Sequence, residues 1–200
     1  ADRYLNRLSQ ICEADEKYGN GTGHLLNETA RYTALWMTYE DTIRVADLKT
    51  RRSRFERVSA ESKISDEQIM EVREYLHPMS EEIADTLPTP IGKWILRTKP
   101  VTKTIEKISA DGIILNTASI GGYLLLYFVA RLKPIRPRSL RFNLEQERID
   151  TWLAKINTLA ATNYDLACEV CECANVIKGY GETHRNGWRN FTAIMAEVDK

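Results

Sequence analysis

The spacing of apolar side chains constrains the fold of this chain more than any other feature of its sequence. Apolar residues recur every three or four positions along most of the 200 residues, which is the period of an α-helix. The clearest stripe has spacings of four, three, four and three and consists of Tyr32, Trp36, Tyr39, Ile43 and Ala46. Such a stripe predicts one long helix with a single buried face. We expect an all-α fold, a bundle of roughly seven to nine helices with no significant sheet.

Capping residues predict where several helices begin and end. Ser65-Asp66-Glu67-Gln68 forms a capping box, which predicts a helix that ends at the His77-Pro78 step. Asn143 with Gln146 predicts another capping box, and Asn163 is the expected cap of the helix that follows. The last three helices are expected to bury Ile149, Trp152, Leu153 and Ile156; Ala167, Val170, Ala174 and Ile177; and Trp188, Phe191, Met195 and Val198.

The most apolar stretch, residues 113–132, predicts a buried helix rather than a membrane span. Its length would suit a bilayer, but it contains Asn116, Thr117 and Ser119, and Arg131 lies near its end. A span that faces lipid needs a cleaner apolar run. We therefore expect no membrane partner.

Charge and length set further limits. The chain has 28 Lys and Arg against 28 Asp and Glu, and so weak a net field argues against nucleic acid as a partner. No hydrophobic leader precedes the first polar helix, which favours a cytoplasmic protein. The length suits one helical domain over residues 1–200, with an alternative in which helices in 1–78 pack on a core in 79–200. The start at Ala1 suggests a piece of a longer chain.

Four cysteines, Cys12, Cys168, Cys171 and Cys173, raise the question of metal binding. The last three fall in a predicted helix, where pairing among them would be strained. Zinc needs four tetrahedral ligands, and no run of His or Cys elsewhere completes a set. We expect these cysteines to pack as small apolar residues, and we expect no metal site.

One segment near the C-terminus is unusual in composition. Lys178-Gly179-Tyr180-Gly181-Glu182-Thr183-His184-Arg185-Asn186-Gly187 is similar to the K-G-Y-G-[DE]-T-H-x-x-G signature of the indolepyruvate ferredoxin oxidoreductase beta-subunit family. The likeness continues, in the same order, through four other segments: Leu87-Pro88, Gly92-Lys93-Trp94, Arg138-Ser139-Leu140-Arg141-Phe142 with Glu145-Gln146, and Asn163-Tyr164-Asp165-Leu166-Ala167. Roughly residues 80–200 resemble the C-terminal helical region of that family, whereas the first 80 share only a helical, charged character.

The resemblance implies a role in oxidative decarboxylation of aryl 2-oxo acids to aryl-acetyl-CoA, with ferredoxin as electron acceptor. In that family, thiamine diphosphate and iron–sulfur clusters belong mainly to the alpha chain. The sequence has neither a G-D-G…N diphosphate motif nor the C-x₂-C-x₂-C-x₃-C cluster spacing, so we expect no cofactor on this domain.

The expected function is therefore an accessory domain that assembles subunits or shapes the approach of substrate and CoA, with the other domains or subunits of the oxidoreductase as its partners. The alternative is a purely structural or dimerising helical module with no ligand.

Two segments supply the candidate site residues. No catalytic group is expected in isolation, and His184 with Glu182 is the pair in the signature segment that suits acid–base chemistry. The expected substrate or partner contacts are Lys178, Tyr180, Thr183 and Arg185, with Arg136, Arg138 and Arg141 of a basic turn that suits CoA phosphates or an acidic surface. Two alternatives stay open: the glycine-rich segment only caps helices, with Gly179 in the left-handed conformation, and the basic turn is only a solvated loop.

Overall fold

The computed structural model describes every residue except 64–67, 69, 77, 178, 180 and 200, and the described chain is predominantly helical. Helices make up 75% of it, which confirms the helical class. The expected seven to nine helices were too few, because the described residues form eleven α-helices, two short 3₁₀ helices and a two-stranded sheet. None of the helices that the described residues form is long and apolar enough to cross a membrane.

The chain divides into two compact units. Unit 1 comprises residues 1–39 and 144–200, and unit 2 comprises residues 40–143. The subdivision suggested by the sequence, at residue 78, falls inside unit 2.

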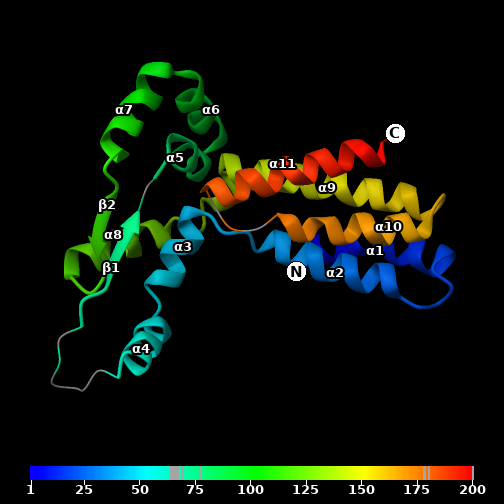
Figure 1. Ribbon diagram of the computed structural model, residues 1–200, viewed down its shortest axis with the longest axis horizontal. Helices are drawn as coiled ribbons and strands as arrows, with labels where there is room; N and C mark the ends of the chain where they lie inside the picture. Colours follow the sequence, from blue (N-terminus) through cyan, green and yellow to red (C-terminus); the bar gives the residue numbers. More distant parts are fainter. Residues whose placement is uncertain (64–67, 69, 77, 178, 180, 200) are drawn as a thin grey trace. The chain divides into compact units, whose positions relative to one another are not determined.

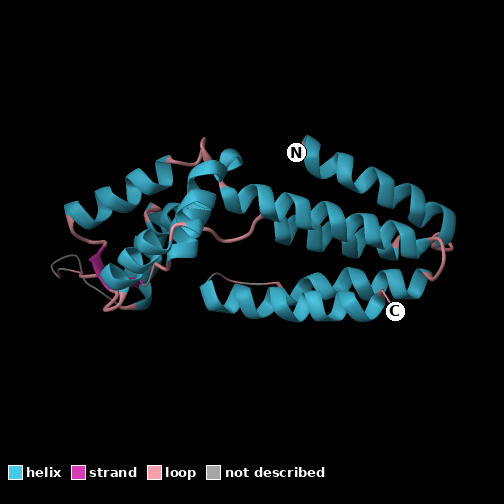
Figure 2. Cartoon of the chain, turned by 90° about the horizontal axis from the view of Figure 1, so that it is seen from above, coloured by secondary structure: helices cyan, strands magenta, loops and turns pink. Residues whose placement is uncertain are grey.

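Unit 1 is a bundle of five α-helices whose long axes lie alongside one another (Figures 1 and 2). Its elements are α1 (Asp2–Tyr18), α2 (His24–Met37), α9 (Leu140–Ala160, from residue 144 on), α10 (Tyr164–Glu172), the 3₁₀ helix η2 (Cys173–Val176) and α11 (Gly181–Val198). Its core is continuous and draws on all five helices, from Ile11 and Leu25 through Ile149 and Val170 to Phe191. The buried faces expected from helical periodicity are confirmed for the last three helices: every expected residue is either in this core or packed against it.

A buried carboxylate joins three elements at one end of this bundle. Asp15 of α1 accepts a hydrogen bond from the Tyr164 hydroxyl (2.5 Å) and another from the backbone N–H of Leu26 (3.2 Å). The Tyr164 oxygen in turn accepts from the N–H of Leu25 (3.2 Å). The first N–H groups of a helix have no partner within it, and no side chain of the N-cap residue Gly23 serves α2. Asp15 and Tyr164 therefore supply the missing cap and fix α1, α2 and α10 together.

Unit 2 consists of short elements. They are α3 (Thr42–Lys49), α4 (Arg52–Glu61), β1 (Arg73–Leu76), α5 (Ser80–Thr86), α6 (Thr89–Arg97), α7 (Lys99–Ser109), β2 (Ile113–Asn116), α8 (Ile120–Arg131) and the 3₁₀ helix η1 (Arg136–Arg138). The main helix pairs are α3 with α8 and α5 with α6. Its buried apolar residues are few, among them Ile43, Ala46, Ala84, Ile95 and Leu126.

The sheet corrects two helix predictions. Strands β1 and β2 pair antiparallel, with Arg73 opposite Asn116 and Leu76 opposite Ile113. The helix expected up to His77 is therefore wrong over residues 70–76, while Ser65, Asp66 and Glu67 of its capping box and residue 77 lie outside the described residues. The apolar helix begins at Ile120 rather than at Ile113, because Ser119 caps it by accepting from the N–H of Gly122. Glu74 anchors β1 to the neighbouring helices through ion pairs with Lys49 and Arg54.

Local caps also shift two other boundaries. The predicted long helix over Tyr32–Ala46 is broken after Met37, because the Asp41 side chain accepts from the N–H of Arg44 (2.7 Å) and starts α3. All five residues of its stripe are nonetheless buried. The capping box at Asn143 was wrong: α9 begins at Leu140, and the Ser139 hydroxyl accepts from the N–H of Phe142. The expected cap at Asn163 is confirmed, since its side chain accepts from the N–H of Leu166.

The cysteines are free thiols. Cys171 is fully buried in the unit 1 core, as expected for a small apolar residue, and Cys168 and Cys173 are partly buried against the same core. Burial raises the pKa of the Cys171 thiol to about 12 from its ordinary value of 9.0. A thiolate at this position is strongly disfavoured, in line with a packing role for Cys171.

This pKa predicts a dependence of stability on pH. Between pH 9 and pH 12 the unfolded thiol loses its proton while the folded thiol keeps it, so stability falls as pH rises and is unaffected below that window. We expect the difference in unfolding free energy between wild type and Cys171→Ala to be constant below pH 9 and then to shrink by about 1.4 kcal/mol per pH unit. Urea denaturation of both proteins measures it; an unchanged difference at about pH 10 would contradict the burial of this thiol.

Candidate functional site

The most unusual chemical feature of unit 1 is a carboxylate with no exposure to solvent. Glu145 lies on α9 and is completely buried. Its Oε2 accepts a hydrogen bond from the indole Nε1 of Trp36 (2.6 Å), and its Oε1 lies 3.0 Å from a guanidinium nitrogen of Arg148 and 3.5 Å from Nε2 of His184. An unpaired buried charge is very unfavourable, and the hydrogen bonds from Trp36 and Arg148 replace the water that Glu145 loses on folding. We refer to Glu145, Trp36, Arg148 and His184 as the Glu145 centre.

The Glu145 centre joins two of the motifs that carry the family resemblance. Glu145 belongs to the motif around Arg138–Phe142, and His184 belongs to the glycine-rich segment almost 40 residues later. The structure thus gives His184 a different carboxylate from the one the sequence suggested, because Glu145 faces it while Glu182 is exposed. Thr183 and Arg185, on either side of His184, are exposed, whereas Lys178 and Tyr180 lie outside the described residues.

Two glycines explain how the signature segment turns. Gly179 has φ +70°, the left-handed conformation that glycine adopts at little cost, and α11 begins two residues later at Gly181. A Cβ on Gly187 would meet the carbonyl oxygen of Val176 at 2.4 Å, so only glycine lets α11 approach η2 this closely. This packing buries His184 one turn before Gly187.

An aromatic cleft lies beside the Glu145 centre. It has a volume of about 410 Å³ and lies between α9 and α11, lined by Leu144, Glu147, Arg148, Thr151, Trp152, Lys155, Trp188, Phe191, Thr192, Met195 and Asp199. Trp188 and Phe191 are stacked with ring centroids 5.4 Å apart. The guanidinium carbon of Arg148 lies 3.7 Å from the centroid of the Trp188 ring. Arg148 is thus shared by the cleft and the Glu145 centre.

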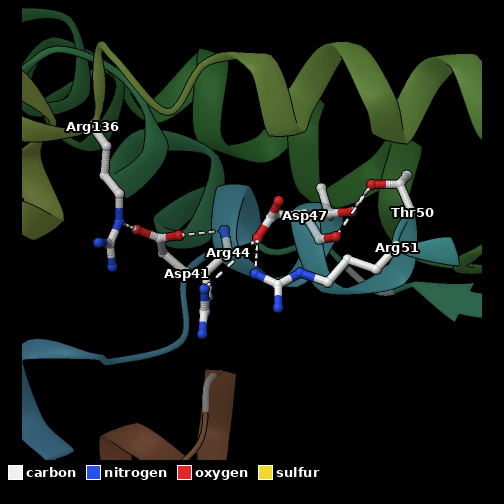
Figure 3. Close-up of polar contacts among 7 residues, drawn as sticks. Asp41, Arg44, Asp47, Thr50, Arg51 and Arg136 are labelled. Carbon is white, nitrogen blue, oxygen red and sulfur yellow. Dashed lines mark hydrogen bonds and ion pairs between the residues drawn. The ribbon is translucent and has the colours of Figure 1, made fainter. Parts of the chain in front are cut away.

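The basic turn is built differently from a row of cations displayed to solvent. Arg136 pairs with Asp41 (2.5 Å), and Arg141 pairs with Asp85 (3.4 Å), whereas Arg138 is exposed. Figure 3 shows Asp41 between Arg136 and the first turn of α3. The same view follows the ion pairs that Asp47 makes with Arg44 and Arg51 along that helix. Two of the three candidate arginines therefore have carboxylate partners within unit 2.

Sequence reasoning missed the roles of Trp36, Glu145 and Arg148. Glu145 precedes Ile149 by four residues and Trp152 by seven, so it lies on the buried stripe of its helix. An acidic residue on an apolar stripe is the signal that marks it, because such a charge needs a partner. Within the described parts of the chain, no group of three or more His, Cys, Asp or Glu is arranged to hold a metal ion.

The Glu145 centre predicts a large effect of one substitution on stability. Glu145→Ala leaves Arg148 and the Trp36 N–H without their acceptor, and we expect a loss of about 3 kcal/mol in unfolding free energy. The matched control is Glu147→Ala, an exposed residue of the same helix, which should change stability by less than about 0.5 kcal/mol. Urea denaturation followed by tryptophan fluorescence compares the two. Equal effects would show that the buried pairing contributes nothing.

Gly187 provides a second test of the packing around His184. Gly187→Ala places a methyl group against the Val176 carbonyl, and we expect α11 to move and stability to fall by about 1–3 kcal/mol. Gly121→Ala is the control, because a Cβ at that helical glycine meets nothing within 4 Å. Thermal unfolding by circular dichroism should show a lower midpoint for the first variant only.

Comparison of the chain with known proteins gives a family but no named relative. No curated protein and no solved structure matches it significantly. Residues 1–197 match the profile of the family described as "Family of unknown function (DUF6537)". Because this match covers nearly the whole chain, including both units and every motif discussed above, the protein belongs to that family.

Proposed function

We propose that this chain is the accessory helical region of an arylpyruvate:ferredoxin oxidoreductase, the system that converts aryl 2-oxo acids and CoA to aryl-acetyl-CoA. By the resemblance, thiamine diphosphate and iron–sulfur clusters belong mainly to the alpha chain of that system, which we call the catalytic chain. The role of this region is to assemble with the catalytic chain and to help form the surroundings of the substrate.

The observation that carries this proposal is that the motifs of the resemblance contact one another. His184 of the signature segment faces Glu145 of an earlier motif in unit 1. In unit 2, the N–H of Leu140 donates to the carbonyl of Leu87 (3.0 Å), and Pro88 forms a β-bridge with Ser139. These contacts support a shared structural role for the segments that carry the resemblance.

A second observation supports assembly with another protein. Helix α8 is apolar on nearly all sides, and a helix of this kind is normally buried on all sides. One side of α8 packs on α3 through residues such as Leu126. Other apolar side chains are exposed along it and just beyond it: Ile120, Leu124, Leu125, Phe128, Leu132 and Ile135. We call these six residues the α8 face. An exposed patch of this kind typically marks a protein interface.

The proposal predicts that the α8 face is needed for association with the catalytic chain. Phe128 is 66% exposed, so Phe128→Asp should leave unit 2 folded while placing a charge in the interface. We expect association with the thiamine diphosphate-dependent chain to weaken by about a hundredfold, in line with an interface hot spot. Pull-down and titration with that chain measure the association, and ferredoxin reduction by phenylpyruvate with CoA measures turnover.

Leu35→Asp is the matched control, because Leu35 is a similarly exposed apolar residue on α2 of unit 1. It should associate like wild type. If wild-type chain does not bind the catalytic chain, and deleting this region leaves turnover unchanged, the proposal fails. Sedimentation of the isolated chain checks the alternative: a stable dimer lost on Phe128→Asp would favour a dimerising module instead.

A further inference from the structure

The turn between α1 and α2 contains an Asn-Gly pair, in which an asparagine side chain can react with the backbone that follows it. The sequence has two such pairs, Asn20-Gly21 and Asn186-Gly187. In both, the glycine has no side chain to hinder an attack by its own nitrogen. Both asparagines are exposed, so access of water does not distinguish the two pairs. The backbone around each pair does.

The first pair forms the centre of an exposed β-turn, which joins α1 to α2 (Figure 1). The N–H of Thr22 donates to the carbonyl of Gly19 (3.1 Å), and both central residues have positive φ, 51° at Asn20 and 74° at Gly21. Two positive φ values in succession are typical of a type I′ turn, for which Asn-Gly is the favoured dipeptide. The geometry of the turn therefore explains why this pair is present.

The reactive groups of this turn have little to restrain them. Among the described residues, none accepts a hydrogen bond from the Gly21 N–H or bonds to the Asn20 amide. A Cβ on Gly21 would meet nothing within 4 Å, so the space around its backbone is open. Attack requires rotation about the bond between the Cα and the carbonyl carbon of Asn20. In an exposed turn this rotation disrupts local hydrogen bonds but no packed core, so the opening costs little free energy.

The second pair is restrained by a helix. Asn186 and Gly187 lie within α11, where each backbone N–H donates to the carbonyl four residues earlier. Gly187 is buried against the carbonyl of Val176, and the Asn186 Oδ1 accepts a hydrogen bond from Arg189 (3.1 Å). The same rotation at Asn186 would break α11 where it packs on η2. Two identical dipeptides are thus placed in opposite backbone surroundings.

We propose that Asn20 is a modification site, at which the turn converts asparagine to aspartate and isoaspartate with solvent water as the co-reactant. The Gly21 nitrogen forms a bond to Cγ of Asn20. The side-chain nitrogen leaves as ammonia and takes the Gly21 N–H proton with it, which leaves a cyclic imide. Water then opens one of the two imide C–N bonds. Opening at the side-chain carbonyl gives aspartate, and opening at the backbone carbonyl gives isoaspartate, in which the chain runs through the side chain. A neutral side chain becomes a carboxylate, with no oxidation or reduction.

The two products differ in what they do to the turn. Aspartate tolerates positive φ as asparagine does, so it preserves the turn. Isoaspartate adds a carbon atom to the backbone between Gly19 and Gly21, so the two hydrogen bonds that Thr22 makes to the Gly19 carbonyl, through its N–H and its hydroxyl (3.0 Å), are lost. Because Gly19 ends α1 and Gly23 precedes α2, isoaspartate loosens the connection between these helices.

The test follows the intact chain by peptide mass spectrometry while it is kept warm, well below its unfolding midpoint, in mildly alkaline buffer. The exchange of ammonia for water changes the peptide mass, and chromatography separates the isoaspartate and aspartate forms. We expect Asn20 to react at least about tenfold faster than Asn186, because Asn186 reacts only when α11 opens locally. In concentrated urea the two rates should become similar, because both pairs then belong to an unfolded chain.

Two variants assign the faster reaction. Asn20→Gln keeps the amide but needs a larger ring for the attack, so the faster reaction should disappear. Asn186→Gln is the matched control and should leave it unchanged. Circular dichroism checks that both variants are folded, and thermal unfolding should give the purified isoaspartate form a lower midpoint than Asn20→Asp. Equal rates at the two asparagines in the folded chain, or a faster reaction that persists in folded Asn20→Gln, would overturn the inference. Equal midpoints would overturn the effect on the turn.

Discussion

The carboxylate of Glu145 is completely removed from water. The polar side chains that surround it compensate for the lost hydration, and they determine how the helices of unit 1 are arranged. An N–H donor comes from Trp36 on α2, a guanidinium from Arg148 on α9 itself, and an imidazole from His184 on α11. Each helix must therefore keep its register relative to α9, because a shift of one residue would carry its polar group away from the carboxylate. The Trp36 ring also packs on Trp152 and Phe191, with centroids 5.5 Å away in each case. The polar contact thus orients the aromatic core as well.

The signature segment can be understood from the same constraint. His184 reaches Glu145 only if α11 starts immediately after α10 and η2 and returns close against them. Gly179 allows the reversal through its positive φ, and Gly187 allows the close approach to Val176. The glycines at these two positions are thus explained by backbone geometry, and the histidine by the carboxylate it faces. These structural roles of Gly179, His184 and Gly187 also shape the aromatic cleft, because the two helices that they align, α9 and α11, are its walls.

The sequence predicted burial better than it predicted where elements begin, except in α8, which was expected to be a buried helix but leaves Ile120 and Phe128 exposed. The stripe from Tyr32 to Ala46 is buried throughout, yet it is divided between α2 and α3 because Asp41 caps a new helix. Periodicity reports which side chains face a core, but it is insensitive to a short break that preserves the face. Residues 113–116 were assigned to a helix because a four-residue apolar strand cannot be distinguished from a helical turn by spacing alone. The partner of His184 was missed because Glu145 is distant in sequence, although its place on an apolar stripe was visible.

The two units differ in how completely they bury their own apolar side chains, and this difference bears on what the chain is for. Unit 1 has a continuous core supplied by all five of its helices. In unit 2, α4 and α7 contain no buried residue, while Ile108 and Ile120 are more than two-thirds exposed. Burial of apolar surface stabilises a fold by about 25 cal/mol per Å². Unit 2 would gain such stabilisation by burying its exposed apolar side chains against another molecule. Unit 1 already buries most of its own apolar side chains. This difference supports the proposal that the chain is part of a larger assembly, with unit 2 as the unit that contacts another protein.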